Sequence, residues 1–205
     1  MTRIILRGLS VAAVGALLPL SALADGSFYL KALGGASDLQ GSSVTLGPVT
    51  GDGRFDTGFI VGGALGYDYA GSPFRAEVEY TYRTADASSL PGGIGTGGDF
   101  ASTTLMLNGF YSFATTGRWT PYVGLGIGAM TEVDFDVSGG GEFSDRSVFA
   151  AQLMVGAEYE ISERATFFGE LRYFDAGEVD MTGAGGSLRA DYRTVDLVAG
   201  ISFSF

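Results

Sequence analysis

Apolar and polar residues alternate along most of the chain after residue 26, with the period of two that is typical of β-strands. The stretch 192–205 shows the pattern most clearly. One set of alternate positions is apolar: Val195, Leu197, Ala199, Ile201, Phe203 and Phe205. The other set is mostly small or polar: Thr194, Asp196, Val198, Gly200, Ser202 and Ser204. The pattern predicts a strand whose two faces meet different environments.

Eight segments carry this alternation and predict strands at 27–37, 55–69, 73–84, 99–114, 119–137, 146–161, 164–175 and 189–205. Short turns at 70–72, 115–118 and 162–163 alternate with longer loops at 38–54, 85–98, 138–145 and 176–188. This alternation is typical of outer-membrane barrels, with short periplasmic turns and longer outer loops. An even strand number also closes an antiparallel sheet without leaving an edge unpaired in lipid. We therefore predict an all-β fold, an eight-stranded antiparallel up-and-down transmembrane β-barrel.

Each predicted strand has one apolar face without charges, as Phe28, Leu30 and Ala32 show in the first. A Lys or Arg on that face would cost about 2–4 kcal/mol at mid-membrane. The aromatic residues also gather near the turns and near the loops, which predicts two interfacial belts. The turn-end belt comprises Phe28, Tyr67, Tyr69, Phe74, Tyr111, Phe113, Trp119, Tyr159, Phe203 and Phe205, and the loop-end belt comprises Phe59, Tyr80, Tyr82, Phe135 and Phe149. A soluble β-sandwich is the alternative, but it would not need such belts.

The opposite faces of the strands carry the charges. The interior of an eight-stranded barrel is just wide enough for side chains to fill, so buried charges there must pair across a narrow lumen. We predict a lumen charge network of Lys31, Arg75, Glu77, Glu79, Glu170, Arg172 and Asp196, with Arg83, Glu158 and Glu160 on the same faces. All members except Arg75 fall near mid-height and are expected to form one network. Gly124, Gly126 and Gly128 leave room for long side chains opposite them.

Two interpretations of this network remain open. Either the ion pairs form a plug that stabilises the barrel core, or they gate a path for ions or protons. Single-channel conductance of Glu79→Ala and Arg172→Ala proteins would separate the two interpretations, because only a gate predicts increased conductance.

The N-terminus is typical of a secretory signal peptide spanning residues 1–24, with the barrel domain at 25–205. Arg3 and Arg7 form its basic region, residues 9–20 its apolar region, and Ala22 and Ala24 a small-x-small cleavage site. An uncleaved anchor is the alternative, but the apolar run is short. Removing Arg3 and Arg7 from the 12 basic residues leaves 10 against 23 acidic ones, which disfavours nucleic-acid binding. The chain has no Cys and no His, and we expect no cofactor, no metal and no catalytic site.

Two weaker motifs have ordinary explanations. Gly93, Gly95 and Gly98 match a dinucleotide-binding string, but no helix follows them, so we interpret the segment as a loop. Asp134, Asp136 and the later Asp145 loosely fit a calcium loop. Since Asp134 and Asp136 alternate with apolar residues, we predict instead that they lie on the inner face of a protruding strand.

The segments Phe28-Tyr29-Leu30-Lys31-Ala32-Leu33-Gly34-Gly35 and Phe74-Arg75-Ala76-Glu77-Val78-Glu79-Tyr80, with the terminal Phe205, complete the pattern. From Asp25 to Phe205 the chain resembles small eight-stranded outer-membrane proteins of the OmpA, OmpX and Opacity kind, especially porin-like surface antigens of alphaproteobacteria. The resemblance implies export through the periplasm to a Gram-negative outer membrane, contact with its lipid bilayer and lipopolysaccharide, and a monomer. It also implies that the barrel-assembly machinery reads a C-terminal signal at Gly200, Ile201, Phe203 and Phe205. In contrast to OmpA, we expect no peptidoglycan-binding domain after the barrel and therefore no tether to the cell wall.

Three functions are compatible with this resemblance. The first is a structural barrel that supports the envelope. The second is a surface protein whose loops contact a host or environmental ligand, although these loops contain few of the aromatic and Arg anchors of tight interfaces. The third is a weak, narrow pore. Enzymes exist on similar barrels, such as lipid A acylases and deacylases, but those rely on a His-containing site and this chain has no His.

Overall fold

A computed structural model describes residues 26–40, 42–46, 49–89, 98–137, 141–145, 148–183 and 186–205, with side chains for 26–40, 56–85, 101–132, 148–177 and 191–205. No helix in these ranges is long and apolar enough to cross a membrane. The strands are β1 (Ser27–Leu39), β2 (Ser42–Leu46), β3 (Val49–Phe55), β4 (Gly58–Asp68), β5 (Phe74–Ser89), β6 (Gly98–Ser112), β7 (Trp119–Val137), β8 (Gly141–Asp145), β9 (Val148–Glu160), β10 (Ala165–Gly183) and β11 (Gly186–Ser204).

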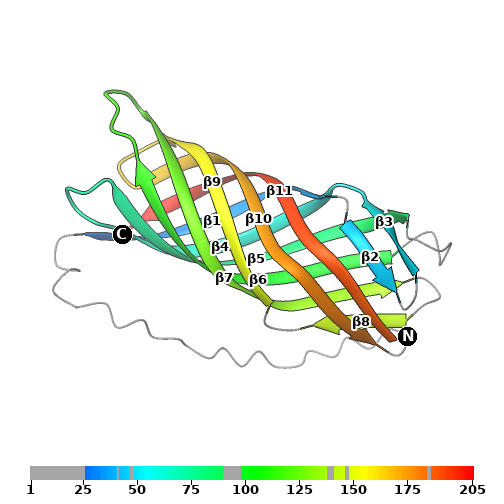
Figure 1. Cartoon of the computed structure of the whole chain (residues 1–205). Coiled ribbons are helices and arrows are strands. Elements are labelled where there is room, and N and C mark those ends of the chain that lie inside the picture. Colours follow the sequence, from blue (N-terminus) through cyan, green and yellow to red (C-terminus); the bar gives the residue numbers. More distant parts are fainter. Residues whose placement is uncertain are drawn as a thin grey trace, which may run out of the picture.

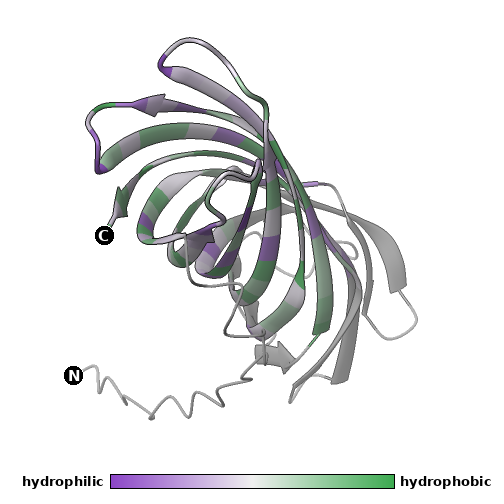
Figure 2. Cartoon of the chain, turned by 90° about the vertical axis from the view of Figure 1, so that its left-hand side faces the viewer, coloured by the Kyte–Doolittle hydropathy of each residue, from purple (hydrophilic) through white to green (hydrophobic). Residues whose placement is uncertain are grey.

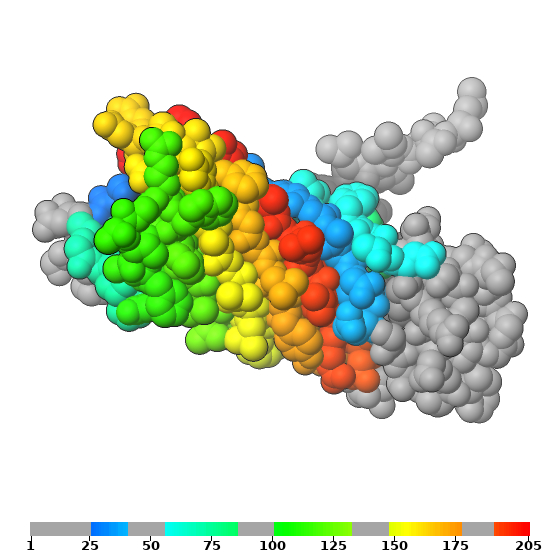
Figure 3. Space-filling view, turned by 90° about the horizontal axis from the view of Figure 1, so that it is seen from above, coloured from blue at the N-terminus to red at the C-terminus, as the bar shows by residue number. Residues whose placement is uncertain are grey.

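Eight of these strands close into a barrel (Figure 1). Each pairs antiparallel with the next in the order β1, β4, β5, β6, β7, β9, β10 and β11, and β11 pairs with β1 from Tyr29↔Ser204 to Leu39↔Thr194. This arrangement confirms the predicted fold class. Figure 3 shows β9, β10 and β11 side by side as inclined yellow, orange and red stripes.

The short turns lie at the barrel end that holds the C-terminus. Between β4 and β5, the Ser72 N–H donates to the Tyr69 carbonyl at 3.0 Å, and Gly71 adopts a φ of 68°. Glycine accepts this left-handed conformation without steric cost. Between β9 and β10, the Ser162 hydroxyl oxygen accepts from the Ala165 N–H at 3.1 Å. The predicted turns at 70–72 and 162–163 are confirmed.

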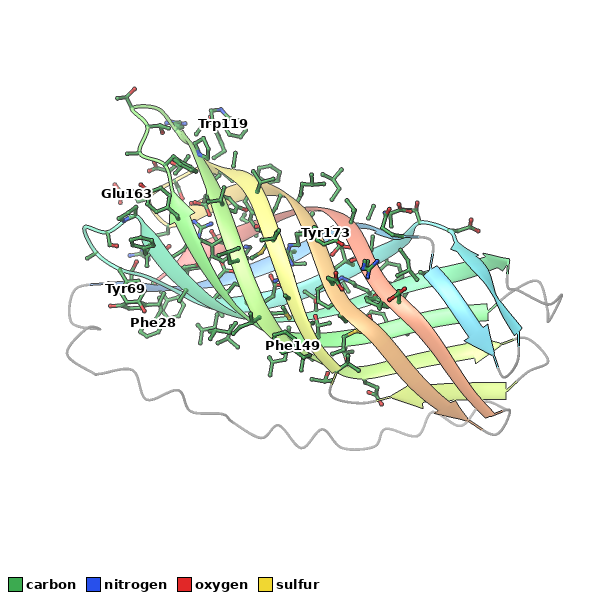
Figure 4. The ribbon with its side chains drawn as sticks, viewed as in Figure 1. Phe28, Tyr69, Trp119, Phe149, Glu163 and Tyr173 are labelled. Carbon is green, nitrogen blue, oxygen red and sulfur yellow. The ribbon has the colours of Figure 1, made fainter. Side chains whose placement is uncertain are left out.

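The apolar face of every barrel strand lies outside. Figure 2 shows apolar and polar residues alternating along the strands. Leu125 is 66% exposed and Phe149 67%, although both belong to the apolar set. Phe28, Tyr69 and Trp119 lie at the end with the C-terminus, whereas Phe149 and Tyr173 lie farther along the barrel (Figure 4). The outer surface is thus an apolar band between aromatic belts, as a bilayer requires.

The connections at the other end contain more structure than the sequence pattern predicts. The expectation of plain loops at 38–54, 138–145 and 176–188 was wrong, because these stretches contain β2, β3, β8 and the long extension of β10 and β11. Backbone groups outside the lipid can pair with neighbouring strands as readily as with water. The β-branched residues Val44, Thr45, Val49 and Thr50 favour such pairing.

A β-bulge in β7 changes the faces of its outer half. Thr103 pairs with Glu132 and Thr104 with Met130, so Thr131 is one extra residue in β7. Beyond it, Asp134 lies opposite Ala101, and Asp136 opposite Asp99. The prediction that Asp134 and Asp136 occupy inner-face positions was therefore wrong, since one extra residue exchanges the two faces of a strand.

Candidate functional site in the barrel lumen

The charges that the alternation assigns to the interior are buried in the structure, apart from those near the short turns. Lys31, Glu77, Glu79, Arg83, Glu170, Arg172 and Asp196 are all 5% exposed or less. The cause is the strand periodicity, since the alternate residues contact lipid. Within the described lumen, each ion pair between different strands has one partner on β5. These partners are Arg75, Glu77, Glu79 and Arg83.

The central pair crosses the whole lumen. Arg172 on β10 binds both carboxylate oxygens of Glu79 on β5, with Nη1–Oε1 at 2.7 Å and Nη2–Oε2 at 2.8 Å. β5 and β10 are four places apart in the ring of eight, so they face each other across its diameter. The Arg172 Nε also donates to Glu170 Oε1, and the Tyr122 hydroxyl donates to Glu170 Oε2 at 2.7 Å. One guanidinium therefore holds two buried carboxylates from opposite walls.

Lys31 and Glu77 form a second buried pair. The Lys31 Nζ lies 3.3 Å from both oxygens of Glu77, and the Tyr29 hydroxyl donates to Glu77 Oε1 at 2.6 Å. The Phe168 ring lies under the same ammonium, with its centroid 4.2 Å from Nζ. A cation–π contact and a carboxylate together replace the water that Lys31 loses on burial.

Asp196 and Arg83 form a separate cluster nearer the outer end. The Arg83 Nε and Nη2 donate to Asp196 Oδ2 at 3.0 and 2.9 Å, and the Ser37 hydroxyl donates to Asp196 Oδ1 at 2.6 Å. The Arg83 Nη1 donates to Thr81 Oγ1 at 2.9 Å. The Phe174 ring centroid lies 4.5 Å from the Arg83 guanidinium carbon.

The remaining predicted member, Arg75, lies at the barrel end with the short turns, three residues after Ser72. Its Nη1 lies 2.6 Å from Glu158 Oε1, and its guanidinium carbon lies over the rings of Phe110 and Tyr122, 4.7 and 4.5 Å from their centroids. The Glu158 side chain is 21% exposed, so this pair meets solvent at the barrel mouth.

The structure thus arranges the predicted residues as four groups at different heights instead of one network. Asp196 is the cross-strand neighbour of Arg172, yet Arg172 turns toward Glu79 and Glu170, and Arg83 reaches Asp196 from β5. Arg83 and Glu158 are the ion-pair partners that the predicted network left out. The alternation places both on inner faces, and Arg83 continues the Arg75-Glu77-Glu79-Thr81-Arg83 pattern, which is the signal that could have added it to the network.

The glycines of β7 make room for polar contacts between their neighbours. Gly126 pairs with Asn108 on β6 and Gln152 on β9, and the Gln152 Nε2 donates to Asn108 Oδ1 at 2.7 Å across it. A Cβ at Gly126 would fall on Asn108 Oδ1, and one at Gly124 would lie 2.5 Å from the Phe110 ring.

The variant Gly126→Ala is therefore expected to lower the free energy of unfolding by about 1–3 kcal/mol, because the added methyl overpacks the lumen and displaces the Asn108–Gln152 hydrogen bond. Urea unfolding in lipid vesicles measures this change. The matched control is Gly109→Ala on β6, where a Cβ meets nothing within 4 Å. Equal stability of the two variants would contradict the packing described for β7.

The other predicted site residues have defined places or lie outside the described chain. Ile201 and Phe203 face outward, and the Phe205 N–H donates to the Phe28 carbonyl at 3.0 Å, next to the β1–β11 seam. At Gly200, a Cβ would contact the Ala32 carbonyl and the Phe168 ring. Ala22 and Ala24 lie outside the described residues. Within the described side chains, no group of three or more His, Cys, Asp and Glu is arranged to hold a metal ion. The side chains of Asp134, Asp136 and Asp145, which the sequence loosely matches to a calcium loop, lie outside the described ones.

Comparison with known proteins agrees with this geometry. The family "Outer membrane protein beta-barrel domain" matches residues 10–205, nearly the whole chain. The chain belongs to this family. The protein is therefore a small outer-membrane β-barrel of a Gram-negative envelope, as predicted, and its apolar band lies in the lipid bilayer of that membrane.

Individual proteins that match the chain share less than 30% sequence identity with it. Outer membrane protein PagN of Salmonella typhimurium is 27% identical over 141 residues, and the match covers 59% of each chain. Neisserial surface protein A is 20% identical with a TM-score of 0.60, over 88% of this chain and 99% of that one. OprG of Pseudomonas aeruginosa is 19% identical with a TM-score of 0.63, over 88% and 96%. At these identities the two solved structures show a shared fold.

Proposed function

We propose that this outer-membrane barrel has a structural role in the envelope and that its lumen is closed to ions by the pairs anchored on β5. The observation that carries the proposal is the bidentate Arg172–Glu79 pair, which spans the lumen diameter with both side chains at most 1% exposed. An ion crossing at this height would have to displace a contact between opposite walls.

The contacts around the central pair favour a permanent plug over a gate. Arg172 is held by two carboxylates, Glu170 is held by Tyr122, and Lys31 is held by Glu77. Opening a path would leave at least one buried charge without its partner, which costs about 3–5 kcal/mol for a buried ion pair. The lumen groups therefore stabilise the barrel as a closed cylinder.

The proposal also includes the partners expected of a protein in this membrane. We propose that the outer end of the apolar band contacts lipopolysaccharide, and that the protein is a monomer without cofactor, nucleic-acid partner or enzymatic activity. We also propose that the barrel-assembly machinery recognises the strand that carries Gly200, Ile201, Phe203 and Phe205. Ile201 and Phe203 suit this role because they lie on the outward face of β11, where it meets β1.

A deletion strain tests the structural role. We expect that loss of the gene lowers the concentration of detergent that the cells tolerate, and that the parent gene restores it. A gene with Asp180→Ser and Arg189→Ser, two changes on the strands beyond the lipid, should restore it equally. If the deletion leaves detergent tolerance unchanged but abolishes attachment to host cells, the surface-interaction function replaces the structural one.

A further inference from the structure

Beyond the lipid band, the strands form a second closed ring that differs from the transmembrane one. On β11, the partner changes from β1, which ends at Leu39↔Thr194, to β2, which begins at Ala190↔Val44. On β5, it changes from β4 to β3, which pairs at Phe55↔Ala87. β2 and β3 also pair with each other, so this hairpin takes the place of β1 and β4.

The third inserted strand completes the ring on the other side. β8 pairs with β7 from Val133↔Asp145 to Val137↔Gly141, and with β10 at Thr182↔Ser144. It therefore takes the place of β9. The ring order becomes β5, β3, β2, β11, β10, β8, β7 and β6, and β6 pairs with β5 as far as Asp86↔Asp99. The extension is again an eight-stranded closed wall.

The two faces of this outer ring have the opposite polarity to the membrane barrel. The buried inner residues Tyr192 and Ser102 set the register. Counting from them, inner-face positions include Val44, Leu46, Phe135, Phe143, Val179 and Leu188. Outer-face positions include Asp99, Asp136, Glu142, Asp180 and Arg189. Asp145, opposite Val133 at the lower end of β8, is a charged exception on the inner face.

The two ends of the lumen also differ in exposure. At the outer end the inner residues Leu39, Ala85, Met130 and Tyr192 are each at most 5% exposed. At the periplasmic end the inner residues Ser112, Thr166, Ser202 and Ser204 are half-buried. Inner side chains at an open mouth meet solvent, as those at the periplasmic end do. The outer ring therefore covers the lumen at the height where it joins the transmembrane barrel.

We propose that the outer ring encloses a second, water-free apolar core, which seals the lumen on the cell-exterior side. A closed eight-stranded ring is just wide enough for side chains to fill. Charged positions outside and apolar positions inside are what such a core requires in water. This goes beyond the proposed function, because the seal does not depend on the ion pairs in the membrane.

Single cysteines test the seal cleanly, because the natural chain contains no cysteine. Val179→Cys and Leu188→Cys occupy inner-face positions, and their neighbours Asp180→Cys and Arg189→Cys occupy outer-face positions on the same strands. Each purified protein is refolded in detergent and treated with a charged, water-soluble maleimide. We expect the inner cysteines to react about tenfold or more slowly than the outer ones, because they need a local opening. Retained heat-modifiable gel mobility establishes that each barrel is folded.

Two outcomes would overturn the seal. One is equal labelling of inner and outer cysteines in folded protein. The other is saturable binding of the apolar dye N-phenyl-1-naphthylamine to the parent protein that the change Phe135→Asp abolishes. That result would mean that the ring holds an open apolar binding cavity. Conductance tests the ion-pair plug, whereas cysteine labelling tests the outer seal. The failure of one proposal can therefore be distinguished from the failure of the other.

Discussion

Replacing Arg172 by methionine lowers the free energy of unfolding by about 3–5 kcal/mol, because the change leaves two carboxylates in the lumen without their cation. Glu79 and Glu170 are both at most 2% exposed, and Arg172 is their ion-pair partner. Methionine retains most of the side-chain volume, so the loss reports on charge more than on packing. Urea titration in lipid vesicles, followed by the fluorescence of the single Trp119, measures the change.

The matched control removes the charges together. A triple variant, Arg172→Met with Glu79→Gln and Glu170→Gln, has no uncompensated charge at this height and should regain most of the lost stability. If Arg172→Met alone costs less than about 1 kcal/mol, as exposed ion pairs do, the description of Arg172 as the centre of a buried plug is wrong.

Placing arginine at Leu125 lowers the free energy of unfolding by about 2–4 kcal/mol, because this position lies at the middle of the lipid-facing surface of β7. Leu125 is 66% exposed and pairs with Gly109 and Leu153, both on outward faces. The same urea titration in vesicles measures the loss. Leu125→Met is the control of similar length without charge and should change stability little. Equal losses for the two variants would show that Leu125 does not contact lipid.

The transmembrane part of the fold could be predicted because each strand is in contact with two different environments. Lipid outside and a narrow lumen inside impose the period of two, which survives in the sequence from Phe28 to Phe205. The start of β7 at Trp119 follows directly from this pattern. Short turns could be predicted too, since Gly71 and Ser162 have defined roles in them.

The outer extension could not be predicted in the same way. β2, β3 and β8 are short, and their residues are also common in loops, so local pattern does not distinguish the two. The bulge at Thr131 leaves no signature of its own, although it reverses the faces of Asp134 and Asp136. The change of strand partners where the outer ring begins depends on pairings between residues far apart in the sequence, such as Val44 with Ala190.

The lumen residues could be identified from the sequence, but their partners could not. Alternation places Glu77, Glu79, Arg172 and Asp196 inside, whereas the choice of partner depends on the relative heights of strands that never touch. Asp196 illustrates this point, because its neighbour in the sheet is Arg172 and its ion-pair partner is Arg83, from β5. Counting from the turns gives heights to within a residue or two, which is the spacing that separates one ion pair from the next.

Single-channel recording tests the central claim most directly. The parent protein, refolded in detergent and inserted into a planar lipid bilayer, should show no unitary conductance steps in symmetrical potassium chloride, because the ion pairs from β5 fill the lumen. Heat-modifiable mobility of the same sample establishes that the inserted barrel is folded. Reproducible steps from folded parent protein, raised further by Arg172→Met, would contradict the plug and favour a gated pore.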